Sequence, residues 1–512
     1  MAKDYLMSIA YHSPAPVIDK NHISSADNQG GYENGHVIKI NGVYHMIITE
    51  LFWVVYADWG SVPARIGYWT SQNGGDWTRI CTIVQGSATG KPEDLSDPKC
   101  NTWSSSWYWN ESENRWNIFV RGWGMFRYRS NIEGPDGIAG PYSDAGQIIP
   151  PINGPHKNWE NPNGGIASFS NIYAGKDGKN YSLAGTGFDS GDKDDSWLIS
   201  LVCADKPEGP WSWADTGDNP VFLYAENPFV NIYEINGERV YFCVYDDLSN
   251  QHSLGYGYSF DGVHWTGKTL DLTGYADWAF SLNYTQSVRT PCGLIREDDG
   301  TYTIIFTAFA PNKDAPEYSW GSYAQVGRVN VRIDETERPP DKNIIFPGDM
   351  KNWAAINGNF RVKHGLYCQN EEKYRGSRDY KSVFTAGKYI DAEIEAALRY
   401  VDSSQEWDEN AKAGVFARAD SNGEGGYRAY LTSREKIQLY AGDKLLAEAN
   451  AGKRPAIFRE LKLSVNGDNI KVYYGGAAPP CIDLHDVTYT EAGYAGIGVY
   501  MSHWHYEKIK IT

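Results

Sequence analysis

Several features that usually reveal a protein's class are missing from this chain of 512 residues. No apolar run approaches the roughly 18 residues that a membrane-spanning helix needs, and the best local run, Ile47 to Tyr56, carries Glu50. No P-loop, HExxH, GxSxG or dinucleotide-binding pattern is found. The sequence therefore argues against membrane insertion and against the nucleotide-, zinc- and serine-dependent enzymes that these patterns mark.

Closely spaced cysteines are missing as well. The seven cysteines are scattered and odd in number, and no CxxC pair occurs, which predicts buried free thiols instead of a disulfide framework or a redox motif. They are Cys81, Cys100, Cys203, Cys243, Cys292, Cys368 and Cys481.

Positively charged residues are outnumbered by negatively charged ones: 47 Lys and Arg stand against 64 Asp and Glu, which gives a net charge of -17. An acidic surface repels nucleic acid and anionic membranes, so we expect no nucleic-acid partner. The start of the chain lacks a signal-peptide pattern. As it stands, the sequence indicates a cytoplasmic protein, and a periplasmic or secreted one if a leader was removed.

Aromatic and turn-forming residues are abundant: 19 Trp, 36 Tyr and 17 Phe accompany 53 Gly and 24 Pro. No sustained helical period is found across the first two thirds of the chain. Many aromatics combined with many turns are typical of an all-β protein with short strands. Aromatic rings also line sugar sites, although any single ring is more often strand core.

One hairpin pattern recurs along the first two thirds of the chain. An alternating apolar strand leads into a tight turn, and an aromatic-rich strand follows. The turns of the five copies lie at Asn41-Gly42, Glu113-Asn114, Asp177-Gly178, Asn236-Gly237 and Asp299-Gly300.

A second hairpin follows each of these. GYWTSQNGGDW at residues 67–77 and GYGYSFDGVHW at 255–265 match at six offsets and begin 188 residues apart, which is three units of roughly 63 residues. Five such units fill about residues 20 to 335. Four short strands repeated five times predict a five-bladed β-propeller over residues 1–338, with Tyr5 to Tyr11 as the outer strand that closes the ring.

A charged, proline-containing stretch, residues 334–342, then reads as a linker. Beyond it, Leu461, Leu463 and Val465 alternate before an Asn-Gly-Asp turn, and a second alternating strand follows. This pattern predicts a separate antiparallel β-sandwich, a jelly roll, over residues 344–512.

Propeller blades gather the starts of their innermost strands at one mouth of a central channel, where ligands bind. Three of the five units carry Glu-Asn at that place, at Glu33, Glu160 and Glu226. Converging carboxyls raise one another's pKa, which suits a glycosidic reaction that needs one protonated and one ionised group. Arg289 precedes the fifth inner strand, where it can bind substrate or lower the pKa of one Glu. The alternative is that each Glu-Asn pair caps a blade turn in solvent.

Several other residues compete for the site. Trp53, Trp103, Trp123, Trp159 and Trp278 are candidate sugar platforms, and His36 is a candidate ligand for substrate or a channel cation. A core role for His36 is the favoured alternative. The remaining carboxylates are interpreted as strand-end and turn residues: Asp97, Asp246, Asp247 and Asp277.

The five units, the Gly-Pro-aromatic hairpins and the spaced carboxylates resemble the five-bladed glycoside hydrolases of family 43 and their relatives in families 32, 62 and 117. The resemblance implies that Glu33 is the general base, Glu160 the pKa modulator and Glu226 the acid. That family has Asp at the first two positions, so the longer Glu side chains leave the stereochemical outcome open.

The last domain resembles concanavalin- or laminin-G-like jelly rolls, with sugar binding or packing as its role.

The sequence thus favours a glycoside hydrolase that removes a terminal sugar from a plant or algal glycan. Candidate sugars are arabinofuranose, xylose and galactose, and the partner is an oligo- or polysaccharide. We expect no required cofactor and no catalytic metal. A structural cation such as calcium in the central channel is compatible with this function. A non-catalytic glycan-binding propeller is the alternative, and a polysaccharide lyase is a third.

Overall fold

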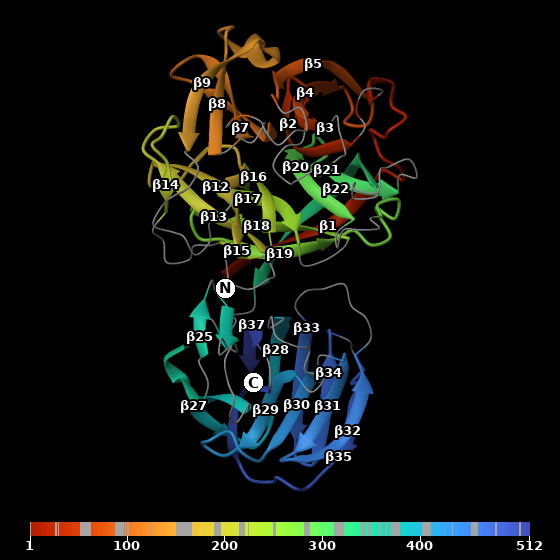
Figure 1. Cartoon of the computed structure of the whole chain (residues 1–512), viewed down its shortest axis with the longest axis vertical. Helices are drawn as coiled ribbons and strands as arrows, with labels where there is room; N and C mark the ends of the chain where they lie inside the picture. The colour runs from red at the N-terminus through yellow and green to blue at the C-terminus, as the bar shows by residue number, and fades with distance from the viewer. Residues whose placement is uncertain are drawn as a thin grey trace. The chain divides into compact units, whose positions relative to one another are not determined.

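The computed structural model divides the chain into two compact units, one holding most of residues 2–337 and the other residues 338–512. Figure 1 shows strands throughout both units. None of the described residues forms a helix long and apolar enough to cross a membrane. The structure describes residues 2–512 apart from 26–27, 29, 52–62, 88–96, 98, 100–101, 123, 150–165, 189–195, 215–220, 224, 249–251, 281–286, 312–321, 339–343, 347–349, 358–359, 364–365, 370–378, 402–410, 433, 452–458, 477–478 and 501–502.

The first unit is a five-bladed β-propeller, as the sequence predicts (Figure 1). Blade one contains β2 (Gly31–Ile40), β3 (Val43–Leu51), β4 (Ala64–Ser71) and β5 (Trp77–Gln85). Blade two contains β6 (Trp103–Asn110), β7 (Arg115–Gly122), β8 (Gly124–Ser130) and β9 (Tyr142–Ile149), with the short helix η3 (Pro135–Ala139) before β9.

Blade three contains β10 (Ile166–Phe169), β12 (Asn180–Phe188), β13 (Ser196–Ala204) and β14 (Ser212–Trp213), with the two-residue strands β11 (Tyr173–Ala174) and β15 (Phe222–Leu223) attached. Blade four contains β16 (Ala225–Ile235), β17 (Glu238–Asp247), β18 (Ser253–Ser259) and β19 (Thr266–Asp271). Blade five contains β20 (Val288–Arg296), β21 (Tyr302–Pro311), β22 (Ser322–Arg338) and β1 (Ala2–His12).

The chain closes the ring with its own N-terminal strand. β1 pairs with β22, so the first strand in sequence is the outermost strand of the last blade, which confirms the closure predicted for Tyr5 to Tyr11. The helix η1 (Ile23–Ser25) follows, and β2 then meets β22 at Gly31 and Ala324. Gly31 has φ +95°, and a Cβ there would lie 2.2 Å from the Ala324 carbonyl oxygen, so only glycine fits this seam.

The two matching hairpins of the sequence occupy equivalent places, between the third and fourth strands of blades one and four. In the first, the Ser71 hydroxyl accepts the Gly74 N–H at 2.9 Å and Asn73 Oδ1 accepts the Asp76 N–H. In the second, the Ser259 hydroxyl accepts the Gly262 N–H at the same distance, while Asp261 caps the turn in the place of Asn73. Identical side-chain caps explain why these segments match at fixed offsets.

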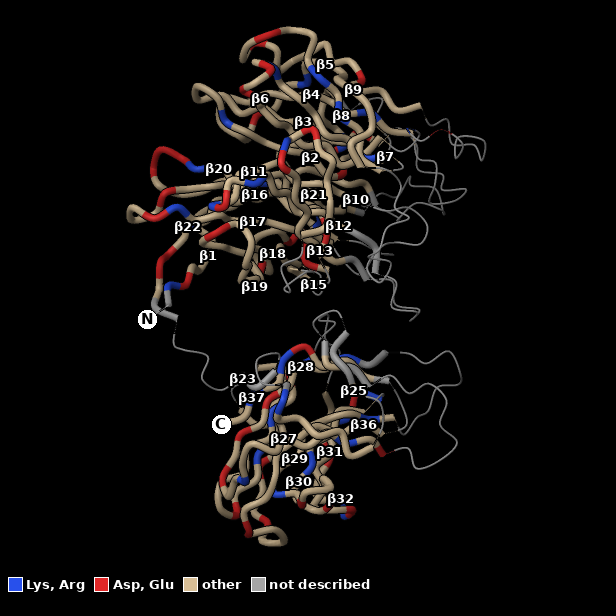
Figure 2. The backbone as a smooth tube through the Cα atoms, turned by 90° about the vertical axis from the view of Figure 1, so that its left-hand side faces the viewer, with Lys and Arg blue, Asp and Glu red and all other residues tan. Residues whose placement is uncertain are grey.

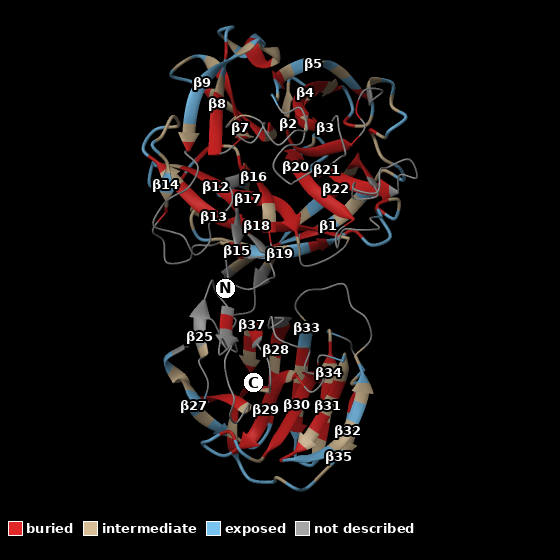
Figure 3. Ribbon diagram, in the orientation of Figure 1, coloured by how far each residue is buried: buried red, intermediate tan, exposed pale blue. Residues whose placement is uncertain are grey.

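The propeller core consists of hydrophobic wedges between neighbouring blades (Figure 3). The wedge between blades four and five, for example, includes Phe242 and Tyr258 from one blade and Ile304 and Phe306 from the other. Each sheet thus buries both faces against its neighbours. That explains why these strands carry apolar and aromatic side chains on both sides.

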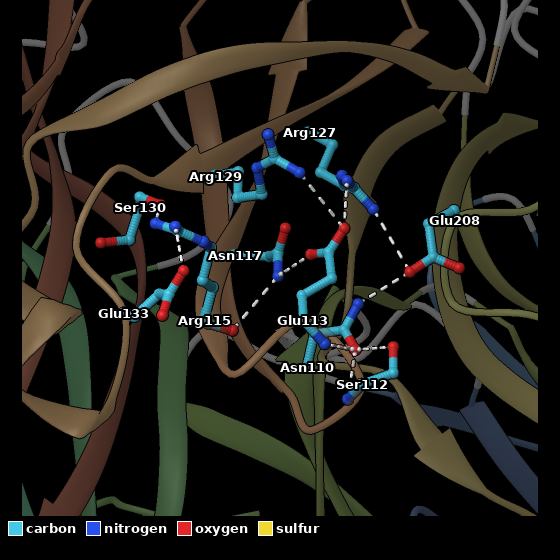
Figure 4. Close-up of polar contacts among 10 residues, drawn as sticks. All are labelled: Asn110, Ser112, Glu113, Arg115, Asn117, Arg127, Arg129, Ser130, Glu133 and Glu208. Atoms are coloured by element: carbon cyan, nitrogen blue, oxygen red, sulfur yellow. Dashed lines mark hydrogen bonds and ion pairs between the residues drawn. The ribbon is translucent and has the colours of Figure 1, made fainter.

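Charged residues concentrate in the turns, and the strands between them are mostly uncharged (Figure 2). One exception is a charged bridge between blades two and three, drawn in Figure 4. There the half-buried Glu113 carboxylate accepts a hydrogen bond from the Arg127 guanidinium at 3.0 Å, and Glu208 of blade three lies 3.4 Å from the same guanidinium. Asn110 also donates to Glu208. These charges are paired with one another, which is typical of a structural cluster.

The second unit is a β-sandwich of two antiparallel sheets, again as predicted. One sheet contains β23 (Ile344–Phe346), β25 (Phe360–Lys363), β26 (Leu366–Gln369), β28 (Ala392–Val401), β33 (Arg459–Asn466), β34 (Asn469–Tyr474), β35 (Ile482–His485) and β37 (His503–Ile511). The other contains β24 (Trp353–Asn357), β27 (Asp379–Tyr389), β29 (Lys412–Ala419), β30 (Tyr427–Thr432), β31 (Lys436–Ala441), β32 (Lys444–Asn450) and β36 (Gly493–Tyr500), with the helix η4 (Met350–Asn352) before β24.

The sandwich core forms where the inner faces of these sheets meet. Leu461, Leu463 and Val465 of one sheet and Val415 of the other are fully or almost fully buried there. Five cysteines of the described residues are free thiols, as the sequence predicts: Cys81, Cys203, Cys243, Cys292 and Cys481. The expected burial holds for Cys243 and Cys292 but is wrong for Cys481, which is exposed.

We predict that the closing strand is essential to the stability of the propeller. Tyr5 is fully buried, with its ring 5.4 Å from Phe242 and 5.3 Å from Tyr258, both in blade four. Tyr5→Ala should lower the free energy of unfolding by ~3–5 kcal/mol because it leaves a cavity between two blades. Urea unfolding of the full chain measures this.

Tyr11→Ala is the matched control, since Tyr11 lies on the same strand and is 54% exposed. It should cost less than ~1 kcal/mol. Equal losses for the two variants would contradict a packed closing strand.

Candidate active site

Each of the five innermost strands has an irregularity near its start. The strand register shifts between Glu33 and Gly35, Trp103 and Ser106, Ile166 and Ser168, Glu226 and Phe229, and Val288 and Pro291. Such bulges re-aim side chains and are common beside active sites. Asn34, Ser104 and Asn227 each have a positive φ at the bulge, a strained conformation for a non-glycine residue.

The bulged residues bond to one another across the ring, and Figure 1 shows β2, β16 and β20 near its middle. The Asn34 amide of blade one donates to Asn227 Oδ1 of blade four at 2.5 Å. The Asn227 amide donates to the Thr290 hydroxyl of blade five at 3.1 Å, and its backbone N–H donates to the Ser168 hydroxyl of blade three at 3.2 Å. These bonds explain why Asn follows Glu in blades one and four: the amide ties blades together and holds the preceding Glu in place.

Three carboxyls surround the Arg289 guanidinium. Arg289 Nη2 lies 2.6 Å from Glu33 Oε1 and 4.0 Å from Glu226 Oε2, while Nε lies 3.7 Å from Asp246 Oδ2. The side chains of Arg289, Glu33 and Asp246 are 6%, 3% and 0% exposed, and that of Glu226 is 13% exposed. The structure therefore brings the predicted residues Glu33, Glu226 and Arg289 together. Among the three carboxyls, Glu226 is the most accessible to a ligand.

The electrostatics of this cluster favour a retained proton. Burial raises the pKa of Glu226, and the Glu33 charge raises it further, whereas Arg289 and Arg121 oppose the rise. Burial also raises the pKa of Asp246 to about 8, again against the influence of Arg289. Three carboxylates cannot all ionise around one guanidinium in a poorly hydrated place without a large penalty. The site can therefore hold ionised and protonated carboxyls side by side.

Glu33 uses its two oxygens differently. Oε1 accepts hydrogen bonds from Arg289 at 2.6 Å and from the Thr290 hydroxyl at 3.4 Å. Oε2 is buried and accepts no hydrogen bond from the described residues. Buried polar atoms in proteins usually have a hydrogen-bond partner, so this oxygen is available to accept one.

The other candidates lie in various places. Glu160, Trp159, Trp53 and Trp123 fall outside the described residues. Trp103 stands at the start of β6, at the same end of its strand as Glu33, and packs against Leu51 and Ala64 while its indole N–H has no partner among the described residues.

His36 and Trp278 make packing contacts. Nδ1 of His36 accepts the Trp107 backbone N–H at 3.0 Å, and its ring stacks on Phe229 at 5.0 Å. Burial lowers the pKa of His36 to about 3, so it is neutral. These are the contacts of the core histidine that the sequence analysis favoured. The Trp278 ring stacks on Phe306 at 6.1 Å within the wedge between blades four and five, so protein covers that face of the ring.

Asp246 was interpreted from the sequence as a strand-end residue; it does lie at the end of β17, and the structure also places it in the Arg289 cluster, which the sequence analysis did not predict. The register set by the Asn236-Gly237 turn alone would pair Glu226 with Asp247. The bulge between Glu226 and Phe229 shifts the pairing to Asp246, and nothing in the sequence signalled that shift. Asp97 and Asp277 do cap turns, accepting the backbone N–H of Lys99 and Gly274.

Among the described residues, no three His, Cys, Asp or Glu side chains form a group that could hold a metal ion. His36, a candidate for a channel cation, already uses one ring nitrogen as an acceptor inside the protein.

No family model and no curated protein matches this sequence. Solved structures similar to it include a family 43 glycoside hydrolase from Bacillus licheniformis, at 14% identity, 99% coverage of both chains and a TM-score of 0.33. A family 117 glycoside hydrolase from the marine bacterium Zobellia galactanivorans has 13% identity, covers 64% of this chain and 90% of its own, and has a TM-score of 0.41.

The carbohydrate-binding module CBM66 from Bacillus subtilis is also similar, at 16% identity over 32% of this chain and 96% of its own, with a TM-score of 0.27. Families 43 and 117, which the sequence resembles, are thus both represented.

We predict that Arg289 stabilises the buried Glu33 carboxylate, which lies 2.6 Å from its guanidinium. Arg289→Met leaves that carboxylate without its partner, so the variant should lose ~3–5 kcal/mol of unfolding free energy near pH 8. The loss should be smaller at pH 5, because carboxyls without Arg289 have raised pKa values in the folded state and take up protons as the pH falls. Urea unfolding at the two pH values measures the difference.

The exposed Arg296, at the other end of the same strand β20, provides the matched control as Arg296→Met. It should cost less than ~1 kcal/mol at both pH values. A loss for Arg289→Met that is the same at pH 5 and pH 8 would contradict the charge argument.

Proposed function

We propose that this chain is a glycoside hydrolase that removes a terminal sugar from a plant or algal glycan, with residues 1–338 as the catalytic domain. The observation that carries the proposal is the Arg289 cluster: one arginine nitrogen lies within 4.0 Å of both Glu33 and Glu226. Two carboxyls held close together can act on the same glycosidic bond, whereas widely separated carboxyls would favour simple binding.

Glycoside hydrolysis needs a carboxyl that gives a proton to the leaving oxygen and a carboxylate that activates water or attacks the sugar. Glu226 is suited to the first role because its pKa is raised and it is the most exposed of the three carboxyls. Glu33 is suited to the second, since Arg289 and Thr290 hold one oxygen and leave the other without a bond from the described residues. Glu160 is proposed as a third carboxyl that modulates the acid.

The substrate class is proposed as a neutral oligo- or polysaccharide with arabinofuranose, xylose or galactose at its end. Residues 344–512 are proposed as an accessory domain.

A panel of aryl glycosides and plant and algal oligosaccharides tests the assignment of hydrolase activity. If the protein binds a glycan in that panel but hydrolyses none, the glycan-binding alternative replaces the hydrolase.

If Glu226 donates the proton, Glu226→Gln should lower kcat by 10²-fold or more on a natural oligosaccharide. An aryl glycoside whose leaving group needs no proton should be affected far less, because its bond breaks without acid assistance. Comparing kcat on the two substrates measures this.

Glu234→Gln is the control, because Glu234 lies on the same strand β16 and is exposed. It should leave both rates within about twofold, as surface substitutions usually do. Equal losses for Glu226→Gln on the two substrates would remove the acid role.

Glu33→Gln should behave differently from Glu226→Gln. An amide neither activates water nor attacks the sugar, so kcat should fall by about 10²–10⁴-fold on both substrates, whatever the leaving group. Urea unfolding of the same variant shows whether it remains folded. A folded Glu33→Gln variant with unchanged kcat would exclude Glu33 from the reaction.

A further inference from the structure

We propose that Asp246 is a positioning residue of the reaction site: it stands across the hairpin from Glu226 as a neutral carboxyl and thereby leaves the charge of Arg289 to Glu33. The inference rests on the proposed function and concerns the same site. It assigns Asp246 a role that sequence reasoning did not give it.

The hairpin of blade four places Asp246 where it stands. β16 and β17 pair so that Glu226 lies opposite Asp246 and Ala225 lies opposite Asp247. Side chains of opposed residues project from the same face of a sheet, and successive residues alternate between faces. Asp246 therefore shares the face of Glu226, toward Arg289. Asp247 instead accepts hydrogen bonds from the Ser253 hydroxyl at 2.8 Å and the Thr269 hydroxyl at 3.1 Å within its own blade.

Asp246 cannot act on a substrate directly. Its side chain is 0% exposed, whereas that of Glu226 is 13% exposed. It can reach a bound sugar only through its neighbours, so its influence has to pass through Arg289 or Glu226.

The distances show which carboxylate binds Arg289 most closely. Its contact with Glu33 is a charge-assisted hydrogen bond of 2.6 Å, while its Nε lies 3.7 Å from Asp246, beyond hydrogen-bond length. An ionised Asp246 would draw the guanidinium away from Glu33. A neutral Asp246 lets the short bond to Glu33 persist, so the charge of Arg289 stays with Glu33.

The charged groups around Asp246 explain why it stays neutral. Burial is the main cause of its raised pKa, and the negative charges of Glu226, Glu33 and Asp247 add to the rise against the opposing charge of Arg289. The resulting pKa of about 8 keeps the proton on Asp246 across the neutral range.

A neutral buried Asp lowers stability, and this makes the proposal testable without a substrate. An Asp in the unfolded chain has a pKa near ~3.9, so between about pH 5 and pH 8 the unfolded chain has released a proton that folded Asp246 retains. The folded state therefore loses stability relative to the unfolded state as the pH rises through this window. A protein keeps such a group where function requires it.

The test compares D246N with D247N in the full chain. Asn is neutral at every pH, so D246N removes the proton difference. The ratio of the unfolding equilibrium constant of the wild type to that of D246N should grow about tenfold per pH unit from pH 5 to pH 8. D247N, on the adjacent residue that bonds Ser253 and Thr269, keeps Asp246, so its stability should still fall as the pH rises from 5 to 8, as in the wild type. Urea unfolding at four pH values measures all three proteins.

The second measurement is a pH profile with an aryl glycoside whose leaving group needs no proton. The kcat/KM of the wild type should fall above about pH 8, where Asp246 ionises and competes for Arg289, and D246N should lack this fall. At pH 6–7 D246N should retain kcat/KM within about threefold, since it preserves the neutral side chain. A merely structural role would leave the profile unchanged.

The proposal is overturned if the stability ratio does not change with pH, which would mean that Asp246 is ionised in the folded protein. It is also overturned if D246N remains folded but loses 10²-fold or more activity at pH 6–7, or if the alkaline fall persists in D246N. If the wild type hydrolyses no glycoside, the proposed function fails, and the pH series of unfolding still decides the state of Asp246.

Discussion

The Arg289 guanidinium lies among three carboxyls, of which Glu33 and Asp246 are buried and Glu226 is partly exposed, and the chemistry of this site depends on the imbalance of charge. A single positive charge satisfies one carboxylate well, here Glu33 at 2.6 Å. The remaining carboxyls have little water to stabilise a second or third negative charge, so they bind protons more tightly than usual. One arginine thus produces both an ionised and a protonated carboxyl within a small space.

The ring geometry of the propeller brings these charged side chains close together. Each blade begins its inner strand with a bulge, and the residues at the bulges project polar groups toward the other blades. Asn227 links blades three, one and five by hydrogen bonds to Ser168, Asn34 and Thr290. These bonds hold Glu33 and Glu226 at fixed places although they belong to different blades. Preorganisation of this kind keeps charged groups from relaxing away from one another.

The burial of apolar side chains between the blades offsets the loss of stability that the buried polar groups at the centre of the ring cause. Buried carboxyls with raised pKa values lower stability at neutral pH, and strained bulges add to that cost. Between the blades, large apolar side chains such as Trp69, Trp107 and Phe242 are almost completely buried. The closing strand β1 adds Tyr5 to one of these wedges. The propeller can therefore keep an unfavourable group such as Asp246 in its mouth.

The sequence by itself determined the five hairpins and the closing strand, because these depend on turn residues and alternation among near neighbours. It also indicated Glu33, Glu226 and Arg289, since each precedes an inner strand. Only the tertiary structure showed that Arg289 meets Glu33 across 256 residues, that Asp246 joins them, and that protein covers faces of His36 and Trp278. Local pattern sets strands and turns. Burial and charge, which set each pKa, come from residues far away along the chain.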